Sequence, residues 1–323
     1  MVALGGGHGL YASLSALRVV TGELTAVVTV ADDGGSSGRL RRELGVLPPG
    51  DLRMALAALC GDDEWGSTWS AVVQHRFGAT RPRLEACGLE AGDGAAGEGE
   101  LHGHAVGNLL IVALWELLGD TVAGLDWVGR LLGAHGRVLP MASVPLDILA
   151  EVELDGVVST VTGQVACALT PGRVRAISLI PKNPPACPEA VRAVLDADWV
   201  VFGPGSWFTS VLPHLKVPEL AEALHVTKAK RLVTLNLAPQ PGETDDFSPQ
   251  QHLEVLRRHA PDLVIDVVLA DTGVVDDPDA LEKAVAAMGG RLVMADVAAE
   301  DGSPRHDPRR LASVLDEIFL QKR

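Results

Sequence analysis

The sequence predicts an α/β protein whose strands form a mainly parallel sheet joined by crossover helices. Short runs of β-branched residues alternate with helical stretches along the chain, which is the order of elements in such a sheet. The run at residues 24–30 is almost entirely apolar, as expected of a strand that is covered on both faces. Each expected strand also ends at a polar or glycine-rich loop, and open parallel sheets bind ligands at those loops.

The same pattern divides residues 1–323 into the elements of a single domain with an insertion. We expect strands at residues 2–4, 24–30, 199–202, 231–237, 263–269 and 292–295, and helices at residues 10–20, 51–59, 105–118 and 125–133. Residues from about 60 to 135 are predicted to form a helical insertion with a flexible glycine-rich loop at 81–103. Residues of about 138–180 alternate between apolar and polar side chains, which predicts a small β meander beside the main sheet.

The composition favours a soluble protein and excludes several functional classes. Of the 323 residues, 47% are hydrophobic, which suffices for a large core. The formal net charge of −15 argues against a nucleic-acid partner, because coating a duplex requires a broad basic surface. The apolar runs are shorter than the ~20 residues of a membrane span. With no C-x-x-C pair and no signal-peptide pattern, we expect a cytoplasmic protein.

A glycine cluster at Gly5–Gly9, which includes Gly6, Gly7 and His8, lies between the first strand and the first helix. Glycine allows backbone N–H groups to approach a phosphate at a helix N-terminus. The cluster therefore predicts a phosphate cradle, although a tight turn without a ligand is an equal alternative. A dinucleotide fingerprint fits only loosely, and the lysine of a P-loop is missing.

A second polar string, ADDGGSSGRLR at Ala31–Arg41, follows the second strand. The adjacent carboxylates of Asp32 and Asp33 suit a hard cation such as Mg²⁺, which prefers oxygen ligands. In the same string, Ser36 and Ser37 supply hydroxyl donors and Arg39 supplies a guanidinium for phosphate. Asp-Gly is common in solvated turns, but the whole string is too particular for a generic turn.

Two helix starts carry further candidates. Asp51, in the string PPGDLR, suits a helix N-cap, and its position one βα unit after Asp32 and Asp33 also suits a shared cation site. His104 and Asn108 begin the expected helix at 105–118. They suit either hydrogen-bond partners at a helix start or ligand contacts, because a metal site would need a third ligand.

The last candidates lie in the second half of the chain. Gly203, Pro204, Gly205, Ser206 and Thr209 follow the strand at 199–202 and combine a constrained turn with hydroxyl donors, which suits an anion; the spacing is not that of a hydrolase nucleophile elbow. The stretch 240–245 could border the pocket or cap the next helix. Arg305 could bring a cation to a diphosphate or lie in a solvated turn.

Taken in order, these strings resemble the YvcK/CofD-like family, specifically its YvcK, or gluconeogenesis-factor, branch. The resemblance rests on GGGHG at Gly5–Gly9, ADDGGSSGRLR at Ala31–Arg41, PPGDLR at Pro48–Arg53, QHRF at Gln74–Phe77, HAVGNL at His104–Leu109, GPGSWFTSVLPHL at Gly203–Leu215 and QPGETDDF at Gln240–Phe247. His8 departs from the threonine that is usual in the branch. Pro308 stands after Arg305-His306-Asp307, where some relatives carry a hydroxyl residue, so phospho-regulation is not expected at that position.

The resemblance implies a Rossmann-like three-layer fold and the binding of UDP-sugars such as UDP-GlcNAc or UDP-glucose. It also implies a role in cell shape and in growth on gluconeogenic carbon sources. The CofD branch instead transfers a phospholactyl-type group with Mg²⁺ held by acidic residues. The matching positions here are Asp32, Asp33 and Asp51.

Three hypotheses follow, in decreasing order of support. The first is a regulator that binds a nucleotide sugar without evident catalysis, with the diphosphate over Gly5–Gly9 and Gly203–Ser206. The second is a Mg²⁺-dependent transferase of the CofD type. The third, a nicotinamide-dependent oxidoreductase, rests only on the loose glycine pattern. A homodimer and an unidentified protein partner stay open.

Overall fold

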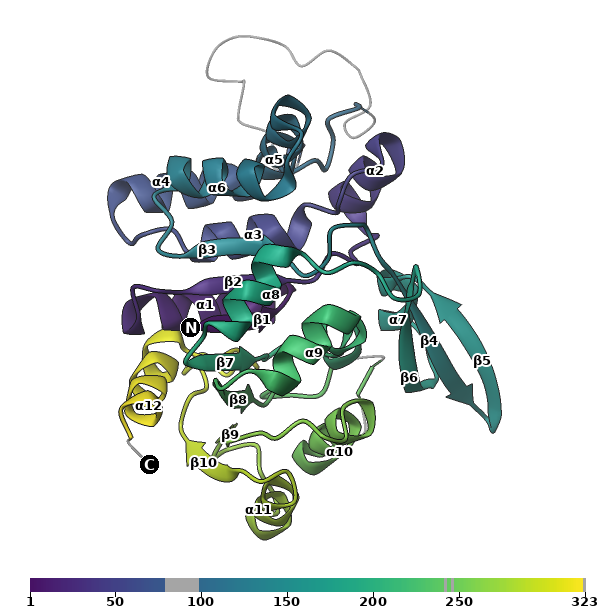
Figure 1. Cartoon of the computed structure of the whole chain (residues 1–323), viewed down its shortest axis with the longest axis vertical. Helices are drawn as coiled ribbons and strands as arrows, with labels where there is room; N and C mark the ends of the chain where they lie inside the picture. Colours follow the sequence, from purple (N-terminus) through teal and green to yellow (C-terminus); the bar gives the residue numbers. More distant parts are fainter. Residues whose placement is uncertain (79–98, 241–242, 245–246, 322–323) are drawn as a thin grey trace.

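A seven-stranded parallel sheet forms the centre of the protein (Figure 1). The computed structural model describes residues 1–78, 99–240, 243–244 and 247–321. The strands of the sheet are β1 Val2–Gly5, β2 Thr25–Val28, β3 Arg137–Pro140, β7 Trp199–Phe202, β8 Lys230–Thr234, β9 Val267–Asp271 and β10 Arg291–Ala295. Their spatial order is β10-β9-β8-β7-β1-β2-β3, and all neighbouring pairs are parallel. The expected mainly parallel sheet is confirmed.

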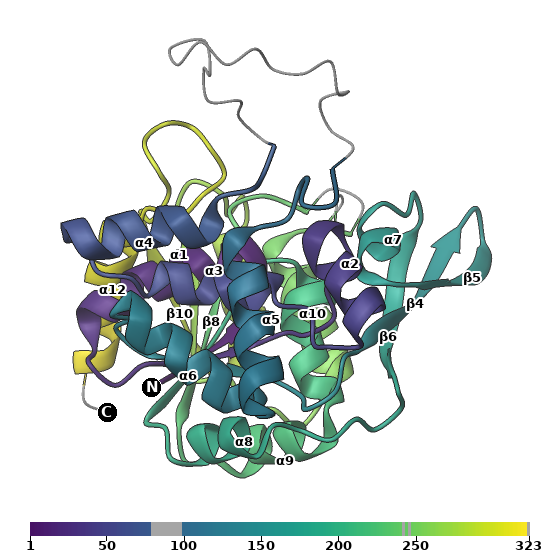
Figure 2. The ribbon, with the colours of Figure 1, turned by 90° about the horizontal axis from the view of Figure 1, so that it is seen from above.

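Helices cover both faces of this sheet and give three layers (Figures 1 and 2). The α-helices described are α1 Gly7–Val20, α2 Gly35–Leu44, α3 Gly50–Ala58, α4 Glu64–Gln74, α5 Val106–Leu118, α6 Thr121–Leu132, α7 Gln164–Ala168, α8 Pro188–Leu195, α9 Pro218–Val226, α10 Pro249–His259, α11 Pro278–Ala286 and α12 Pro308–Leu320. α1 packs against α12 on one face, and α8 packs against α9 on the other. Across the described residues, every helix is too short or too polar to span a bilayer.

The direction of the chain reverses at β1. From β1 the chain proceeds outward through β2 to β3, and it then returns to β7 on the other side of β1 and continues through β8 to β10. The loops that leave β1 and β7 therefore diverge onto opposite faces of the sheet. Such a switch point leaves a crevice at the carboxyl ends of the strands, where open α/β sheets bind their ligands.

Local sequence explains why these two strands are central. β1 and β7 are buried along their whole length, which requires the short continuous apolar runs seen in the sequence. α1 buries Leu10, Leu14 and Leu17 at helical spacing. It begins at Gly7, three residues before the predicted start, so His8 and Gly9 belong to its first turn.

The expected helical insertion is present as α4, α5 and α6, which lie beside α3 and precede β3 (Figure 1). Most of the predicted glycine-rich loop, residues 79–98, lies outside the described residues. Arg76 and Ala105 form an isolated antiparallel bridge. This bridge joins the end of α4 to the start of α5.

A small antiparallel sheet is present as expected, but its predicted range needs one correction. β3 falls inside the predicted range of 138–180 but pairs with β2, so it belongs to the main sheet. The small antiparallel sheet consists of β4 Asp147–Leu154, β5 Val157–Thr162 and β6 Arg173–Ile180, in the order β5-β4-β6. β4 is central because its alternating pattern buries one face, whereas β5 is exposed and forms an edge. The intervening α7 carries the chain from β5 across to β6.

Gly9 has a packing role that an alanine should not fulfil. A Cβ atom at this position would lie 2.2 Å from the carbonyl oxygen of Pro204 and 2.5 Å from the Cα of Gly205, both of which are backbone atoms. We expect Gly9→Ala to lower the free energy of unfolding by about 1–3 kcal/mol, as overpacking does, in a urea titration. The control is Gly22→Ala, because no atom lies within 4 Å of that Cβ position. Equal stability of the two variants would contradict the close packing of these loops.

Candidate functional site

The loops after β1, β2 and β7 meet at the carboxyl edge of the sheet. The loop after β1 leads directly into α1, and the loop after β2 leads into α2. Both helices have a glycine N-cap, Gly6 and Gly34, with no side-chain cap. The first N–H groups of an α-helix have no partner inside the helix. These two helix starts therefore present backbone donors to the crevice.

Asp51, in the first turn of α3, is the buried acid of this site. Its side chain accepts a hydrogen bond from the backbone N–H of Gly7. Its Oδ2 is buried and has no partner among the described residues. Burial, and then the negative charge of Asp32, raises the pKa of Asp51 from 3.8 to about 7. A buried polar atom without a partner calls for an explanation such as a missing ion or ligand.

Asp32 lies beside Asp51, and glycines provide the room for both side chains. A Cβ on Gly6 would lie 2.5 Å from Oδ2 of Asp51, and a Cβ on Gly50 would lie 2.7 Å from Oδ2 of Asp32. Oδ1 of Asp32 accepts from the N–H of Gly34 at 2.9 Å. We call Asp32 and Asp51 the carboxylate pair. Their free oxygens suit a hard divalent cation.

Asp33 does not join this pair, contrary to the expected pairing of the two adjacent carboxylates. Its Oδ1 accepts from the backbone N–H of Val165 at 3.0 Å, so it caps the start of α7. Adjacent side chains of an extended segment point to opposite sides. The structure therefore brings Asp32 together with Asp51 and directs Asp33 toward the small sheet.

Ser36, His104 and Asn108 are brought together in a buried network behind the pair. The hydroxyl of Ser36 lies 3.0 Å from Nδ1 of His104 and accepts from Nδ2 of Asn108 at 3.0 Å. Oδ1 of Asn108 accepts from Nε of Arg53 at 3.0 Å. Burial, and then the charge of Arg39, lowers the pKa of His104. The network joins α2, α3 and α5, which agrees with the alternative of hydrogen-bond partners at a helix start.

Two predicted phosphate donors are used differently. Arg39 donates to the backbone carbonyls of His102 and Glu100 at 2.7 and 2.6 Å, so its guanidinium anchors the segment before α5. Arg305 is largely exposed and forms an ion pair with Asp301 in its own loop, at 2.9 Å. It is not joined to the carboxylate pair by any contact among the described residues.

The loop after β7 is held by two residues that were not among the predicted site residues. The side chain of Asn236 accepts from the N–H of Gly205 at 2.8 Å and donates to its carbonyl at 2.9 Å. The carboxylate of Glu243 accepts from the hydroxyl of Ser206 at 2.6–2.7 Å and from that of Thr209 at 3.2 Å. Burial raises the pKa of Glu243. The hydroxyls predicted to bind an anion are thus already occupied by a carboxylate.

The sequence contained a signal for one of these residues. Glu243 lies in the QPGETDDF string, whose role was left open between pocket border and helix cap; Ser248 is the actual cap of α10. Asn236 follows β8 in an apolar context and stands in no motif. Pro204 and Ser37 are both buried in the same region, the latter in the first turn of α2, whereas His8 is exposed.

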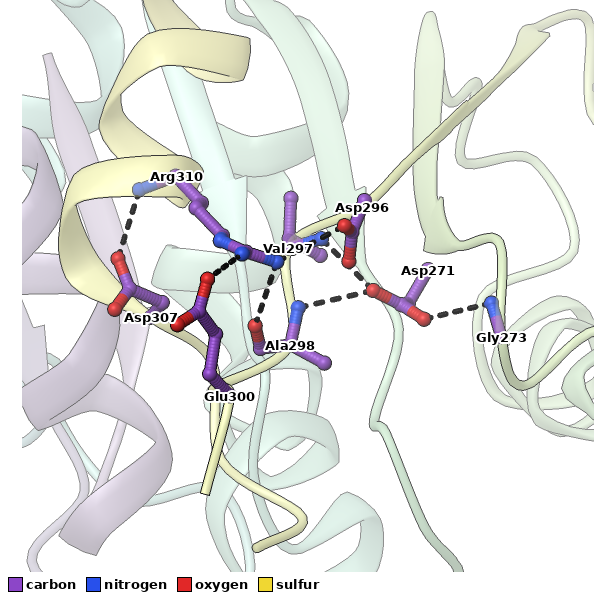
Figure 3. A network of polar contacts seen from close by, with 8 residues as sticks. All are labelled: Asp271, Gly273, Asp296, Val297, Ala298, Glu300, Asp307 and Arg310. Carbon is purple, nitrogen blue, oxygen red and sulfur yellow. Dashed lines mark hydrogen bonds and ion pairs between the residues drawn. The ribbon is translucent and has the colours of Figure 1, made fainter. Parts of the chain in front are cut away.

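A second polar network lies farther along the same edge (Figure 3). The carboxylate of Asp271, at the end of β9, accepts from the N–H groups of Gly273, Val297 and Ala298 at 2.8–2.9 Å. Arg310 pairs with Asp296 at 2.9 Å and with Glu300. These contacts fix the loop that precedes α12. Among the described residues, those around the carboxylate pair included, no three His, Cys, Asp or Glu side chains form a group that could hold a metal ion.

Comparison with known proteins assigns the family. The family model of 2-phospho-L-lactate transferase CofD matches residues 1–303. A gluconeogenesis factor of Listeria monocytogenes is 35% identical over 98% of this chain and 94% of its own length. A Mycobacterium tuberculosis protein, provisionally named a gluconeogenesis factor, is 50% identical over 98% and 90%. The chain belongs to the YvcK branch of the CofD-like family.

A solved structure supports the described fold. The crystal structure of a UPF0052 family member from Bacillus halodurans superimposes with a TM-score of 0.83 at 31% identity, and the match covers 99% of this chain and 98% of that chain. The expected α/β architecture and the expected family are therefore both confirmed.

The raised pKa of Asp51 predicts a pH-dependent cost in stability. The carboxyl is protonated below about pH 7 in the folded chain but only below about 3.8 when unfolded. The folded state therefore holds the extra proton, and the free energy of unfolding falls as the pH rises from about 4 to about 7. The Asp51→Asn variant does not lose this stability, because its amide does not titrate. The difference between its free energy of unfolding and that of the wild type should therefore rise by up to about 4 kcal/mol over that pH range.

Urea unfolding at a series of pH values measures this difference, without added divalent cations. The control is Asp262→Asn, which changes an exposed carboxylate in the same manner. A stability difference between Asp51→Asn and wild type that stays constant from pH 4 to pH 8 would contradict a buried, protonated Asp51.

Proposed function

We propose that this protein binds a nucleoside-diphosphate sugar, of the UDP-GlcNAc or UDP-glucose type, together with a divalent cation. The observation on which the proposal rests is the carboxylate pair. Asp51 has an unpartnered buried oxygen beside Asp32, and both acids lie at the switch point of the sheet. Mg²⁺ is usually held by one or two carboxylates and completed by substrate phosphates. The pair fits that donor set.

The surrounding backbone supports a diphosphate in the same place. The starts of α1 and α2 direct backbone N–H groups and positive helix-dipole ends toward the crevice. The carboxylates alone would repel a diphosphate, since like charges at short range are unfavourable. A cation held by Asp32 and Asp51 removes this repulsion. Phosphate binding and cation binding should therefore depend on each other.

We infer that the bound ligand has a regulatory role. Ser206 and Thr209, the hydroxyl groups of the crevice loop, are hydrogen-bonded to Glu243, and these contacts do not form the Ser–His arrangement of a hydrolase nucleophile. The related proteins of Listeria and Halalkalibacterium are named gluconeogenesis factors. We infer that ligand binding reports nucleotide-sugar supply and thereby controls growth on gluconeogenic carbon sources and cell morphogenesis.

The second candidate is a transferase of the CofD type. The observation in its favour is again the carboxylate pair. Metal-bound diphosphates are substrates for group transfer, and neutralisation of their charge by the metal makes the main contribution to catalysis. In that case Asp32 and Asp51 would hold the cation. Asp33, which accepts a hydrogen bond from Val165, would position α7. Consumption of a nucleoside-diphosphate-linked donor, with release of the nucleotide, would favour this candidate over the regulator.

Calorimetric titration with UDP-GlcNAc, with and without Mg²⁺, followed by GDP, tests the proposal. We expect Mg²⁺ to strengthen UDP-GlcNAc binding at least ten-fold, which is about 1.4 kcal/mol. Asp32→Asn should remove this gain because it deletes one of the two anionic ligands. Chromatography of the mixture should recover the ligand intact.

The matched control is again Asp262→Asn, which should bind as the wild type does. A preference for GDP with a strict Mg²⁺ requirement would shift the assignment to the transferase. Failure of the wild type to bind either nucleotide at millimolar concentration would refute both candidates.

A further inference from the structure

The small antiparallel sheet ends in an unpaired strand, β5. One side of β5 pairs with β4, and the order β5-β4-β6 leaves its other side without a strand partner among the described residues. Figures 1 and 2 both show β5 at the outer end of this sheet, on the side away from the seven-stranded sheet. We propose that β5 pairs with β5 of a second copy of this chain, so that the two small sheets join into one.

The sequence of β5 lacks the features that keep an exposed edge from pairing. Natural sheets protect such edges with lysine, proline, a bulge or a very short strand. β5 reads Val-Val-Ser-Thr-Val-Thr, and all of these residues except Val161 are exposed. Its register with β4 runs without a bulge from Val157 to Thr162. Valine and threonine also favour strands, so this edge is suited to pairing and is not protected from it.

The hydrogen bonds to β4 show which backbone groups of β5 point outward. The N–H of Gly163 donates to the carbonyl of Ile148 at 2.8 Å. Opposite residues of an antiparallel pair alternate between hydrogen-bonded and non-hydrogen-bonded pairs. Every second residue back along the strand, from Val161 to Val157, therefore also bonds to β4. The N–H and C=O groups of the residues between them face the open edge. These residues are Val158, Thr160 and Thr162.

The outward groups define the register of a symmetric pair. Two copies related by a two-fold axis contact each other through the same surface. The axis passes beside Thr160, which faces Thr160 of the second copy, and Val158 faces Thr162 on either side. Among symmetric registers, this one uses all three outward residues. Each pair exchanges two hydrogen bonds, so the register forms about six, and Thr–Thr cross-strand pairs are stabilising.

The charges near the edge are compatible with a second copy as the occupant, despite the formal net charge of −15. β5 itself has no charged residue. On β4, Glu153 is paired with Arg175 at 2.6 Å, and Glu151 lies opposite Thr160. In the symmetric register, the two Glu151 residues are three strand spacings apart, which is about 14 Å. This exceeds the Debye length of about 8 Å at physiological ionic strength, so their repulsion is largely screened.

Exposed apolar side chains at both ends of β5 gain cover in this register. The hairpin tip of each copy carries Leu154 and Val157, which are 46% and 68% exposed. In the symmetric register, this tip lies beside Gly163 and Val165 of the other copy, where Val165 is also exposed. A single strand pair nevertheless buries less than the about 800 Å² per partner of a standard interface. We therefore expect a reversible dimer with a dissociation constant in the micromolar range.

The paired edge adjoins the candidate site through α7. β5 leads directly into Gly163 and α7, and the backbone N–H of Val165 donates to Asp33 at 3.0 Å. A second copy that holds the end of β5 therefore also holds the segment that Asp33 binds. The pairing itself requires no nucleotide, so it does not depend on the function proposed above.

Sedimentation velocity of the full chain tests the pairing. The wild type should change from monomer to dimer as its concentration rises from about 1 to about 100 μM. Thr160→Lys should raise the dissociation constant of the dimer at least ten-fold, because two lysines then face each other at the two-fold axis. The matched control is Ser178→Lys, which adds the same charge at an exposed position of β6, away from the pairing edge. It should dimerise as the wild type does.

Cysteine cross-linking tests the register. The Cα atoms of a hydrogen-bonded antiparallel pair lie about 5.5 Å apart, so a short thiol-specific cross-linker should join two copies of Thr160→Cys. Ser178→Cys and the wild type, which share the native cysteines, should give little covalent dimer. If Thr160→Lys does not fold, this comparison decides.

Three results would overturn the proposal. The first is a wild type that stays monomeric at about 100 μM, even if β5 binds an added peptide, because the second copy is then not the occupant. The second is a dimer whose dissociation constant is the same in Thr160→Lys and Ser178→Lys. The third is equal cross-linking of Thr160→Cys and Ser178→Cys.

Discussion

The site depends on the burial of one carboxyl group, that of Asp51, between the start of α1 and Asp32. Its Oδ1 side lies against Gly7 and its Oδ2 side against Gly6. A side chain at Gly6 or at Gly50 would collide with the pair, so this packing accounts for two of the glycines in the loops. Burying an ionisable group beside a like charge is unfavourable. A divalent cation, which the pair can bind, therefore accounts for this unfavourable arrangement.

Carboxyl groups act as hydrogen-bond acceptors at three helix starts around the crevice. Asp51 accepts from the first turn of α1, Asp33 caps α7, and Glu243 bonds the hydroxyls at the π-helical turn Trp207–Val211. Each contact ties a helix start to a segment distant in the sequence. The crevice is consequently well ordered but acidic. A diphosphate can enter such a site when a cation or a displaced carboxylate offsets the charge.

The sequence predicted those features that depend on local pattern. The apolar runs of β1 and β7 predicted buried strands, and the structure confirms both at the centre of the sheet. The position of Asp51 one βα unit after Asp32 and Asp33 suggested a shared site. The sequence could not tell which of the two adjacent acids faces Asp51, because that depends on how α3 packs beside β2. Asn236 and Glu243 contact the β7 loop only through tertiary structure. The hydrogen bonds from Arg39 to backbone carbonyls likewise depend on the position of the segment before α5.

The central claim is that a cation binds the carboxylate pair together with a diphosphate, and proton release measures this most directly. A cation requires Asp51 to be ionised, so the proton held in the free protein must leave on binding. Calorimetry with UDP-GlcNAc and Mg²⁺ in buffers of different ionisation enthalpy counts these protons, and the diphosphate of the ligand does not titrate near neutrality. We predict release of nearly one proton at about pH 6, below the pKa of about 7, and almost none at about pH 8.5. Asp51→Asn should release none. Tight binding without proton release at pH 6 would contradict the account.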